Sequence, residues 1–271
     1  MMIITLTVIL LLLTTTFATL TYEPVALTVN NQFVTLSNGF VQLQINLASP
    51  SIEFLSGNLQ GLANFTTPNS LSSPIVLERE DASGNVCTST SPTQYRIITN
   101  TSTLITIEMT VKDCDDSPIV TENWLLSLTP KSRSFTMNVT GTTTGTESPT
   151  PIHAVRRRVP MNSPSIYSFF DRGVVQMMNA NDPAYFAQDN LQRVYGLGTG
   201  TSIDMTFETS SEFLSNVLLS EKGKVEHQQI IVGKMAVQNR WFSGTWLPTT
   251  ISTTMRYTSN IQITPNNHNF P

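Results

Sequence analysis

Two tryptophans and one tyrosine are the residues whose chemistry best suits a ligand. Trp241 and Trp246 flank a small turn in residues 240–246 (RWFSGTW), and Tyr185 is a third candidate. Aromatic faces stack on the C–H-rich faces of sugar rings, and the polar neighbours supply hydrogen bonds. We therefore predict carbohydrate binding by Trp241, Trp246 and Tyr185. The alternative is that these large aromatic side chains fill the edge of the core.

Acidic side chains could support hydrolysis of a sugar bond, which needs two carboxylates on either side of that bond. The candidates are Glu78, Glu80, Asp81, Glu122, Asp171, Asp182, Asp204 and Glu208. No spacing in the sequence shows that two of them face each other, and we expect most of them to be solvated turn and strand residues. A scattered site built from residues such as His153, Asp171 and Glu208 stays open as an alternative.

Other motifs carry less chemistry. His153, His227 and His268 are far apart and form no zinc motif, and there is no G-x-S-x-G elbow. Residues 196–200 (GLGTG) are interpreted as a hairpin turn, because a strand pattern and not a helix follows them. The run 156–158 (RRR) is interpreted as strand charges rather than a processing site or a basic patch. The sequence predicts no metal and no organic cofactor.

The first residues predict entry into the secretory pathway. Residues 3–13 form an apolar run, and Thr14 to Thr16 and then Phe17-Ala18 follow it. This run is too short to span a bilayer comfortably, so residues 1–18 are predicted to be a signal peptide that is cleaved after Ala18. The segment lacks Lys or Arg before the apolar run, and an uncleaved anchor is the alternative. We expect a secreted protein with no later membrane span.

Two further features agree with secretion. The chain has two cysteines, Cys87 and Cys114, and an even count in an oxidising compartment predicts one disulfide, which would stabilise the fold by roughly 3 kcal/mol. Two free buried thiols are the alternative. Three N-x-Ser/Thr triplets predict glycosylation at Asn64, Asn100 and Asn138.

Composition and pattern indicate the elements that must position these residues. Only 13% of the 271 residues are charged, the net charge is −4, and Thr, Ser and Asn are abundant. This balance suits exposed strand faces and gives no electrostatic footprint for nucleic acid. Alternating apolar and polar residues predict strands, bounded by Gly, Pro, Asn and Ser clusters. The predicted strands are 41–47, 52–55, 74–80, 94–99, 104–112, 120–128, 134–140, 153–159, 166–170, 202–208, 213–219, 225–232 and 250–257.

The strand spacing predicts an all-β fold, a large antiparallel sandwich with little helix. Residues 182–191 alone are predicted to be helical, because Asp182-Pro183 suits a helix start. Residues 19–271 are expected to form a single domain. Residues 141–151 (GTTTGTESPTP) are either a linker or, as we favour, a long loop between two sheets.

Several strand-and-turn phrases resemble a known family. Residues 34–43 (VTLSNGFVQL), 51–55 (SIEFL) and 57–61 (GNLQG) look like the start of a galactose-mutarotase-like β-supersandwich domain. Later stretches resemble secreted glycosidase-like proteins; these are 120–124 (VTENW), 169–177 (FFDRGVVQM), 192–197 (QRVYGL) and 263–271 (ITPNNHNFP). Such domains precede helical (α/α) six-hairpin glycosidases, whose helical domain supplies the hydrolytic carboxylates.

The resemblance implies a carbohydrate-associated module related to glycoside hydrolases. It further implies that the chain is non-catalytic by itself, because no helical domain follows, and that such a domain is a missing partner. His153 and His227 match no mutarotase motif. Two alternatives remain open, a mutarotase- or hydrolase-like enzyme with a site in the concave sheet, and a structural or adhesive extracellular protein.

Overall fold

The structure is a computed structural model, and it describes fourteen segments of the chain. They are residues 24–58, 69–81, 85–89, 94–112, 120–143, 152–162, 164–171, 174–181, 184–188, 193–198, 202–209, 215–221, 224–232 and 256–266. Every regular element in these segments is a β-strand, and every strand pair is antiparallel. The predicted all-β sandwich is confirmed.

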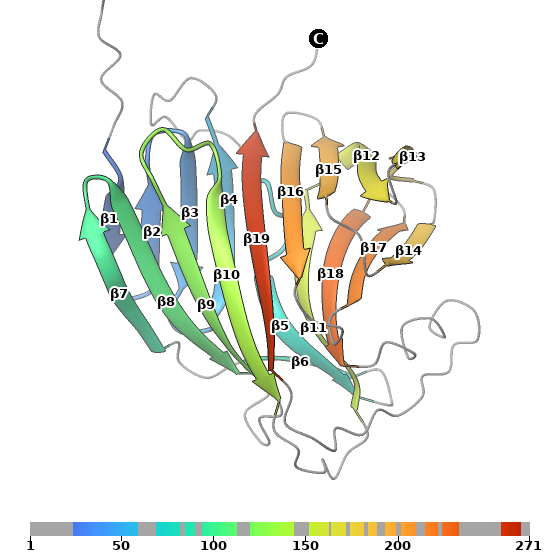
Figure 1. Ribbon diagram of the computed structural model, residues 1–271, viewed down its shortest axis with the longest axis horizontal. Helices are drawn as coiled ribbons and strands as arrows, with labels where there is room; N and C mark the ends of the chain where they lie inside the picture. The colour runs from blue at the N-terminus through green and yellow to red at the C-terminus, as the bar shows by residue number, and fades with distance from the viewer. Residues whose placement is uncertain are drawn as a thin grey trace, which may run out of the picture.

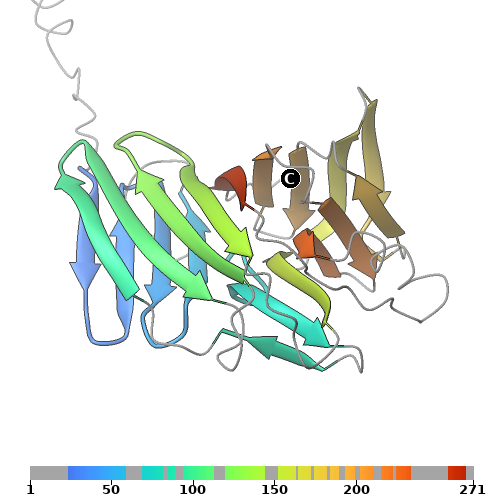
Figure 2. The same ribbon diagram turned by 60° about the horizontal axis from the view of Figure 1, so that its bottom comes forward.

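The strands form two sheets, which Figure 1 shows stacked face to face. The ten-stranded sheet runs in the order β1 (Ala26–Val29), β2 (Phe33–Ser37), β3 (Val41–Asn46), β4 (Ser51–Gly57), β5 (Ile75–Asp81), β11 (Ile152–Met161), β18 (Lys224–Val232), β17 (Ser215–Glu221) and β14 (Ala184–Gln188), with β6 (Val86–Thr88) paired to β5. The nine-stranded sheet runs in the order β13 (Val174–Asn179), β12 (Pro164–Asp171), β15 (Arg193–Gly198), β16 (Ser202–Thr209), β19 (Arg256–Asn266), β10 (Phe135–Thr143), β9 (Val120–Leu128), β8 (Leu104–Lys112) and β7 (Gln94–Thr101). In Figures 1 and 2 the green strands of the second sheet lie over the blue strands of the first.

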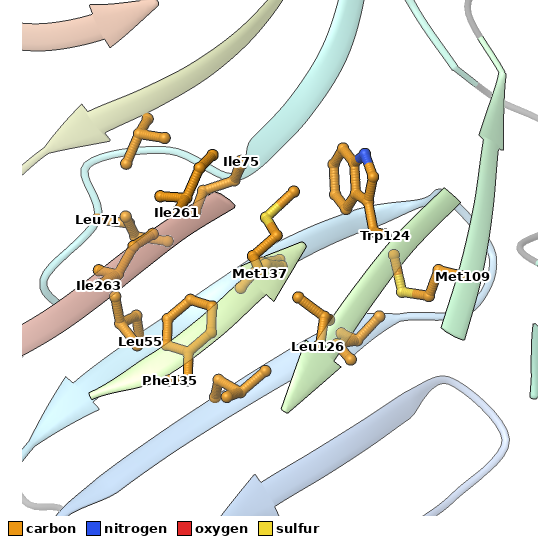
Figure 3. Packing of buried hydrophobic residues seen from close by; sticks show 14 of the residues in the cluster. Leu55, Leu71, Ile75, Met109, Trp124, Leu126, Phe135, Met137, Ile261 and Ile263 are labelled. Carbon is orange, nitrogen blue, oxygen red and sulfur yellow. The ribbon is translucent and has the colours of Figure 1, made fainter. Parts of the chain in front are cut away.

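The inner faces of both sheets build one hydrophobic core. Along β8, Ile105, Ile107, Met109 and Val111 are fully buried, as the alternation predicts. Figure 3 shows Trp124, Phe135 and Met137 of the nine-stranded sheet packed in the same cluster as Leu55 and Ile75 of the ten-stranded sheet. Each large apolar side chain that is buried in this way contributes roughly 2 kcal/mol. The alternation of apolar and polar residues along each strand is therefore what supplies the hydrophobic core between the two sheets.

A tight turn joins β2 to β3 and also ties the two sheets together. Gly39 has φ 82°, a left-handed conformation that glycine adopts without a steric penalty. The buried Asn38 accepts hydrogen bonds from the backbone N–H groups of Phe40 and Val41. Its amide donates to the carbonyl oxygens of Thr129 and Ser132, at 2.6 and 2.8 Å, in the turn between β9 and β10. The turn at residues 37–39 is therefore also a contact between the two sheets.

Two predicted elements are wrong. Residues 184–188 form strand β14, which pairs with β17, where a helix was predicted. The Asp-Pro start signal is local, and pairing with the sheet overrides it. The last predicted strand, 250–257, is shifted, because β19 runs from Arg256 to Asn266 while 250–255 lie outside the described residues.

Two predicted segments lie wholly or mostly outside the described residues. Residues 1–18, the predicted signal peptide, are not described. Of the candidate loop 141–151, residues 141–143 belong to β10, and β11, which lies in the other sheet, begins at Ile152. Among the residues that the structure describes, none forms a helix with the length and apolar character that a membrane span requires.

Candidate functional site: two charged clusters on one strand

Strand β11 carries three consecutive arginines, and the pleat sends them to opposite faces of the ten-stranded sheet. Arg157 contacts Glu122 of β9, which belongs to the other sheet, so Arg157 lies on the inner face. Arg156 and Arg158 alternate with Arg157 along the strand and lie on the outer face. The interpretation of 156–158 as strand charges is confirmed.

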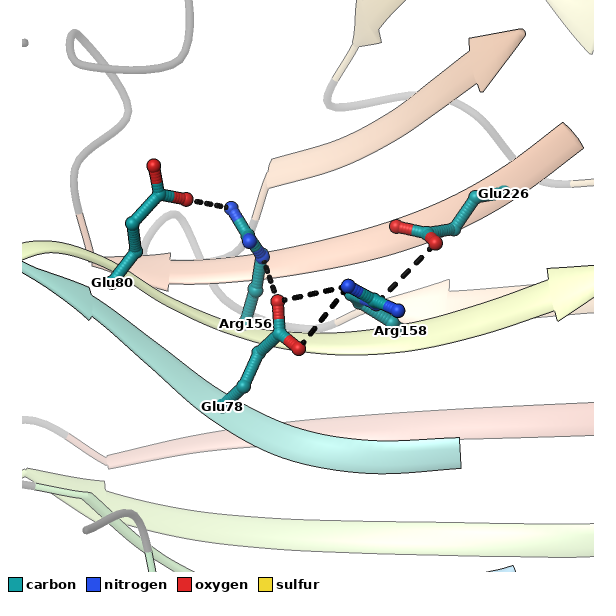
Figure 4. A network of polar contacts seen from close by, with 5 residues as sticks. All are labelled: Glu78, Glu80, Arg156, Arg158 and Glu226. Carbon is teal, nitrogen blue, oxygen red and sulfur yellow. Dashed lines mark hydrogen bonds and ion pairs between the residues drawn. The ribbon is translucent and has the colours of Figure 1, made fainter. Parts of the chain in front are cut away.

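The outer-face residues Glu78, Glu80, Arg156, Arg158 and Glu226 form one network, which we name the outer cluster (Figure 4). Arg156 lies between two carboxylates of β5, with Nε 2.5 Å from Glu78 Oε1 and Nη1 2.5 Å from Glu80 Oε2. Arg158 lies between Glu78 and Glu226, with Nη1 3.3 Å from Glu78 Oε2 and Nε 3.3 Å from Glu226 Oε2. Three adjacent strands, β5, β11 and β18, supply the five side chains.

Burial divides the outer cluster into a covered part and an accessible part. The side chains of Glu78, Glu80 and Arg156 are 2–4% exposed. Those of Arg158 and Glu226 are 27% and 20% exposed. The ion pairs of Arg156 with Glu78 and Glu80 are therefore shielded from water, and Arg158 and Glu226 are the groups that a ligand could reach.

The charges in the covered part hold Arg156 in its ionised form. Burial by itself lowers the pKa of Arg156, but the carboxylates of Glu78 and Glu80 outweigh it, and the net result is a raised pKa. A buried guanidinium is tolerated only when it is paired and hydrogen-bonded in this way.

Arg158 is ion-paired through two of its nitrogen atoms. Nη1 lies near Glu78, and Nε, which is itself buried, lies near Glu226 without an aligned hydrogen bond among the described residues. A guanidinium presents five N–H donors in a rigid fork, and an ionised carboxylate only accepts hydrogen bonds. Arg158 and Glu226 together therefore offer both donors and acceptors.

The inner face carries a second network, which we name the inner cluster: Arg157, Glu122, Trp124, Gln229 and Ser259. Arg157 binds Glu122 through two hydrogen bonds, Nη2 to Oε1 at 2.6 Å and Nε to Oε2 at 3.2 Å. Arg157 Nη1 also donates to Gln229, and Trp124 Nε1 donates to Glu122 Oε2 at 2.5 Å. The arginine and the glutamate have 0% exposed side chains, so this cluster joins the two sheets inside the core.

His227 lies in the same interior, at a position of β18 that pairs with Val159 of β11. It is fully buried, and its pKa falls to about 3, first because burial disfavours the charged imidazole and second because Arg157 repels a second positive charge. His227 is therefore neutral at pH 7. Its inner-face position separates it from Arg158 and Glu226.

Tyr185 is the one predicted sugar-binding residue whose backbone the structure describes. In β14 it pairs with Leu219 of β17, which pairs with Glu226 of β18. Tyr185 therefore occupies the same row of the sheet as Glu226, two strands away, or about 10 Å at the usual strand spacing.

The other predicted site residues are not brought together. Trp241 and Trp246 lie outside the described residues. His153 lies in β11 of the ten-stranded sheet, while Asp171 and Glu208 lie in β12 and β16 of the nine-stranded sheet, with β15 between them. No side-chain contact among these three is described.

The predicted covalent modifications are placed only in part. Cys87 lies in β6 and is not a free thiol, but Cys114 lies outside the described residues, so their pairing stays a prediction. Asn100 and Asn138 lie at exposed positions of β7 and β10, and Asn64 lies outside the description.

Sequence reasoning missed the outer cluster, although a signal was present. The segments 78–80 (ERE) and 156–158 (RRR) place like charges two residues apart, and in a strand such residues share one face. Two strands with opposite charges in this spacing are suited to pair. Within the part of the chain that the structure describes, no three His, Cys, Asp or Glu residues are arranged to hold a metal ion.

The fold has relatives among solved structures, although no family model and no curated protein matches the sequence. An α-galactosidase of family GH36 from Geobacillus stearothermophilus matches with a TM-score of 0.53 at 9% identity, over 90% of this chain and 41% of that one. The galactosidase domain of an α-galactosidase-sucrose kinase matches with a TM-score of 0.53 at 12% identity, over 89% of this chain and 42% of that one.

A TPR-domain containing protein from Parabacteroides distasonis matches with a TM-score of 0.50 at 11% identity, over 88% of this chain and 48% of that one. The chain thus spans less than half the length of each of these three relatives, and the likeness is one of fold. The chain shares its β-sandwich fold with part of each of these proteins, two of which are galactosidases, as the resemblance in the sequence implies.

Proposed function

We propose that this protein is a secreted carbohydrate-binding module and that it holds a sugar against Arg158 and Glu226 on the outer face of the ten-stranded sheet. The observation that carries the proposal is the pair itself. Arg158 and Glu226 are partly exposed and ion-paired to each other, and Arg158 is also paired to Glu78, which is buried with Arg156. A preorganised pair of this kind loses little side-chain entropy when it binds a ligand.

The chemistry of the pair suits neighbouring sugar hydroxyls. A hydroxyl can donate to the Glu226 carboxylate while another accepts from the Arg158 guanidinium. The outer cluster contains three carboxylates and two arginines, so a neutral sugar is favoured over an acidic one. The fold shared with galactosidases supports carbohydrate as the ligand class.

Aromatic stacking completes the proposed site. Tyr185 occupies the same sheet row as Glu226, which suits a ring that covers one face of a bound sugar. Trp241 and Trp246 stay part of the proposal as a stacking platform on the basis of the sequence alone.

The described residues favour binding over catalysis. Each described carboxylate of the outer cluster is ion-paired to an arginine, and His227 is buried on the opposite face. We therefore propose an accessory role, in which a separate catalytic domain supplies the hydrolytic carboxylates.

A glycan array followed by titration calorimetry tests the proposal on the full chain. Glu226→Gln and Arg158→Gln each remove one charged hydrogen-bonding partner and should weaken sugar binding by roughly 10- to 100-fold. Arg96→Gln is the matched control, because the Arg96–Glu108 pair, with an N–O distance of 2.7 Å, lies on β7 and β8 of the other sheet. The affinity of the Arg96→Gln variant for the sugar should stay unchanged.

Trp241→Ala and Trp246→Ala test the aromatic platform separately. Loss of one stacking ring should lower affinity by about tenfold while the protein stays folded. A well-folded protein that binds no glycan would overturn the carbohydrate proposal. Sugar binding that survives both outer-cluster substitutions would move the site away from Arg158 and Glu226.

A further inference from the structure

One end of the sandwich is open, and apolar side chains are exposed there. The edge strands β1 and β7 lie at this end (Figure 1). Val29 of β1 is 47% exposed, and Tyr95 and Ile97 of β7 are 37% and 40% exposed. We name Val29, Tyr95 and Ile97 the open end.

The residues of the open end belong to the inner faces of the sheets. Val29 pairs with Val34, Tyr95 with Met109 and Ile97 with Ile107, and each of these partners is fully buried. Directly paired residues of an antiparallel ladder share one face. The open end is therefore the uncovered margin of the core. An edge strand of this kind also offers unpaired backbone groups to another chain.

A β-bulge brings Asn100 to this same face. The register shifts between Ile97 and Thr99, so that Ile97 pairs with Ile107 while Asn100 pairs with Ile105. Without the bulge, strict alternation would put Asn100 on the face opposite Ile97. With it, Asn100 follows Tyr95 and Ile97 along the inner-face side of β7.

Asn100 is also accessible and correctly flanked for modification. It is exposed, and it begins the triplet Asn100-Thr101-Ser102. The strand ends at Thr101, which pairs with Leu104 across a short turn and accepts a hydrogen bond from the Leu104 N–H at 3.0 Å. Asn100 therefore lies beside a hairpin turn, at an exposed position of the edge strand β7.

We propose that Asn100 carries an N-linked oligosaccharide that covers the open end and blocks the β7 edge. The donor is a lipid-diphosphate-linked oligosaccharide. Its C1 atom forms a bond to Asn100 Nδ2, the C1–O bond to the diphosphate breaks, Nδ2 loses a proton and the lipid diphosphate leaves. The glycan then starts on the face of β7 that also carries Ile97 and Tyr95. This inference rests on the proposed secretion and is independent of sugar binding at the outer cluster.

Peptide mass spectrometry of the full chain, secreted from eukaryotic cells, tests the modification. The peptide that contains Asn100 should carry a glycan, and a glycosidase that releases N-glycans should convert Asn100 to Asp. Asn100→Gln and Ser102→Ala should both remove this glycan, whereas Ser102→Thr preserves the triplet and should retain it. An unmodified Asn100 peptide overturns the proposal, whether or not Asn64 and Asn138 are modified.

The covering role has a separate readout. Both glycan-free variants should bind a hydrophobic dye about twofold more strongly than the native protein and should self-associate in sedimentation experiments. Asn138→Gln is the matched control, because Asn138 lies in β10, near the middle of the same nine-stranded sheet, and its loss leaves the open end covered. If Asn100→Gln and Ser102→Ala behave like Asn138→Gln, the covering role is wrong.

Discussion

The inner cluster and the outer cluster come from the same three residues of β11, yet they differ in what surrounds them. Arg157 lies between two sheets and is closed off from water together with Glu122. Arg158, one residue along, keeps 27% of its side chain exposed beside Glu226. Successive side chains of a strand point to opposite faces. The same basic run therefore joins the two sheets on the inner face and forms an accessible charged pair on the outer face. Burial, and not residue type, separates the structural arginine from the candidate ligand-binding arginine.

The largest effect should come from breaking the inner cluster. Arg157→Met leaves the Glu122 carboxylate buried without its charged partner and should lower the free energy of unfolding by roughly 3–5 kcal/mol. Urea denaturation at pH 7 measures this through a lower midpoint with an unchanged slope. The double substitution Arg157→Met with Glu122→Gln should recover part of the loss. A loss below about 1 kcal/mol for Arg157→Met would contradict the assigned role of this pair.

A smaller effect should appear when the pH is lowered. The pKa of His227 is about 3 in the folded protein and near 6.5 when the chain unfolds, so the unfolded state binds the extra proton more readily. The contribution of His227 to stability is therefore complete above pH 6.5 and is lost as the pH falls toward 3. By pH 4.5 the loss should reach roughly 3 kcal/mol.

His227→Gln isolates this contribution, because glutamine does not titrate. Its unfolding free energy should fall less steeply between pH 6.5 and 4.5 than that of the native protein, as urea denaturation at several pH values measures. Parallel curves for the two proteins would show that another group causes the acid sensitivity.

The smallest effect on stability should come from the accessible pair. Arg158→Gln should lower the free energy of unfolding by about 1 kcal/mol, because water reaches Arg158 and Glu226 and the buried Glu78 keeps Arg156 as its charged partner. The same substitution should weaken sugar binding strongly, so Arg158 should affect affinity more than stability, whereas Arg157 should affect stability. A stability loss at Arg158 as large as that at Arg157 would erase the distinction between the two clusters.

The sequence predicts the fold well because burial repeats with a short local period. The alternation in 104–112 predicts the four buried side chains of β8 directly. The failure at 184–188 has a different cause, because the helix signal at Asp182-Pro183 is local and the pairing of β14 with β17 is not.

The candidate site is harder to predict because its residues come together through strand order. Glu78 and Arg156 are separated by 78 positions in the sequence, and only the pairing of β5 with β11 makes them neighbours. Glu122 is among the acidic candidates for hydrolysis, but it is buried in an ion pair with Arg157, and no local pattern tells this structural role from the role of Glu78. The stacking role of Trp241 and Trp246 stays a prediction.

Strand β19 has a consequence for how the protein is made. It lies between β10 and β16, and among the described strands it is the only connection between the quartet β7–β10 and the group β12, β13, β15 and β16 within the nine-stranded sheet. It is also the last described strand to leave the ribosome. Until β19 is synthesised, β10 and β16 lack their shared strand partner and expose their edges. Such edges are where nascent chains aggregate or bind chaperones. The final joining depends on contacts between residues far apart in the chain, which makes it a slow step of folding.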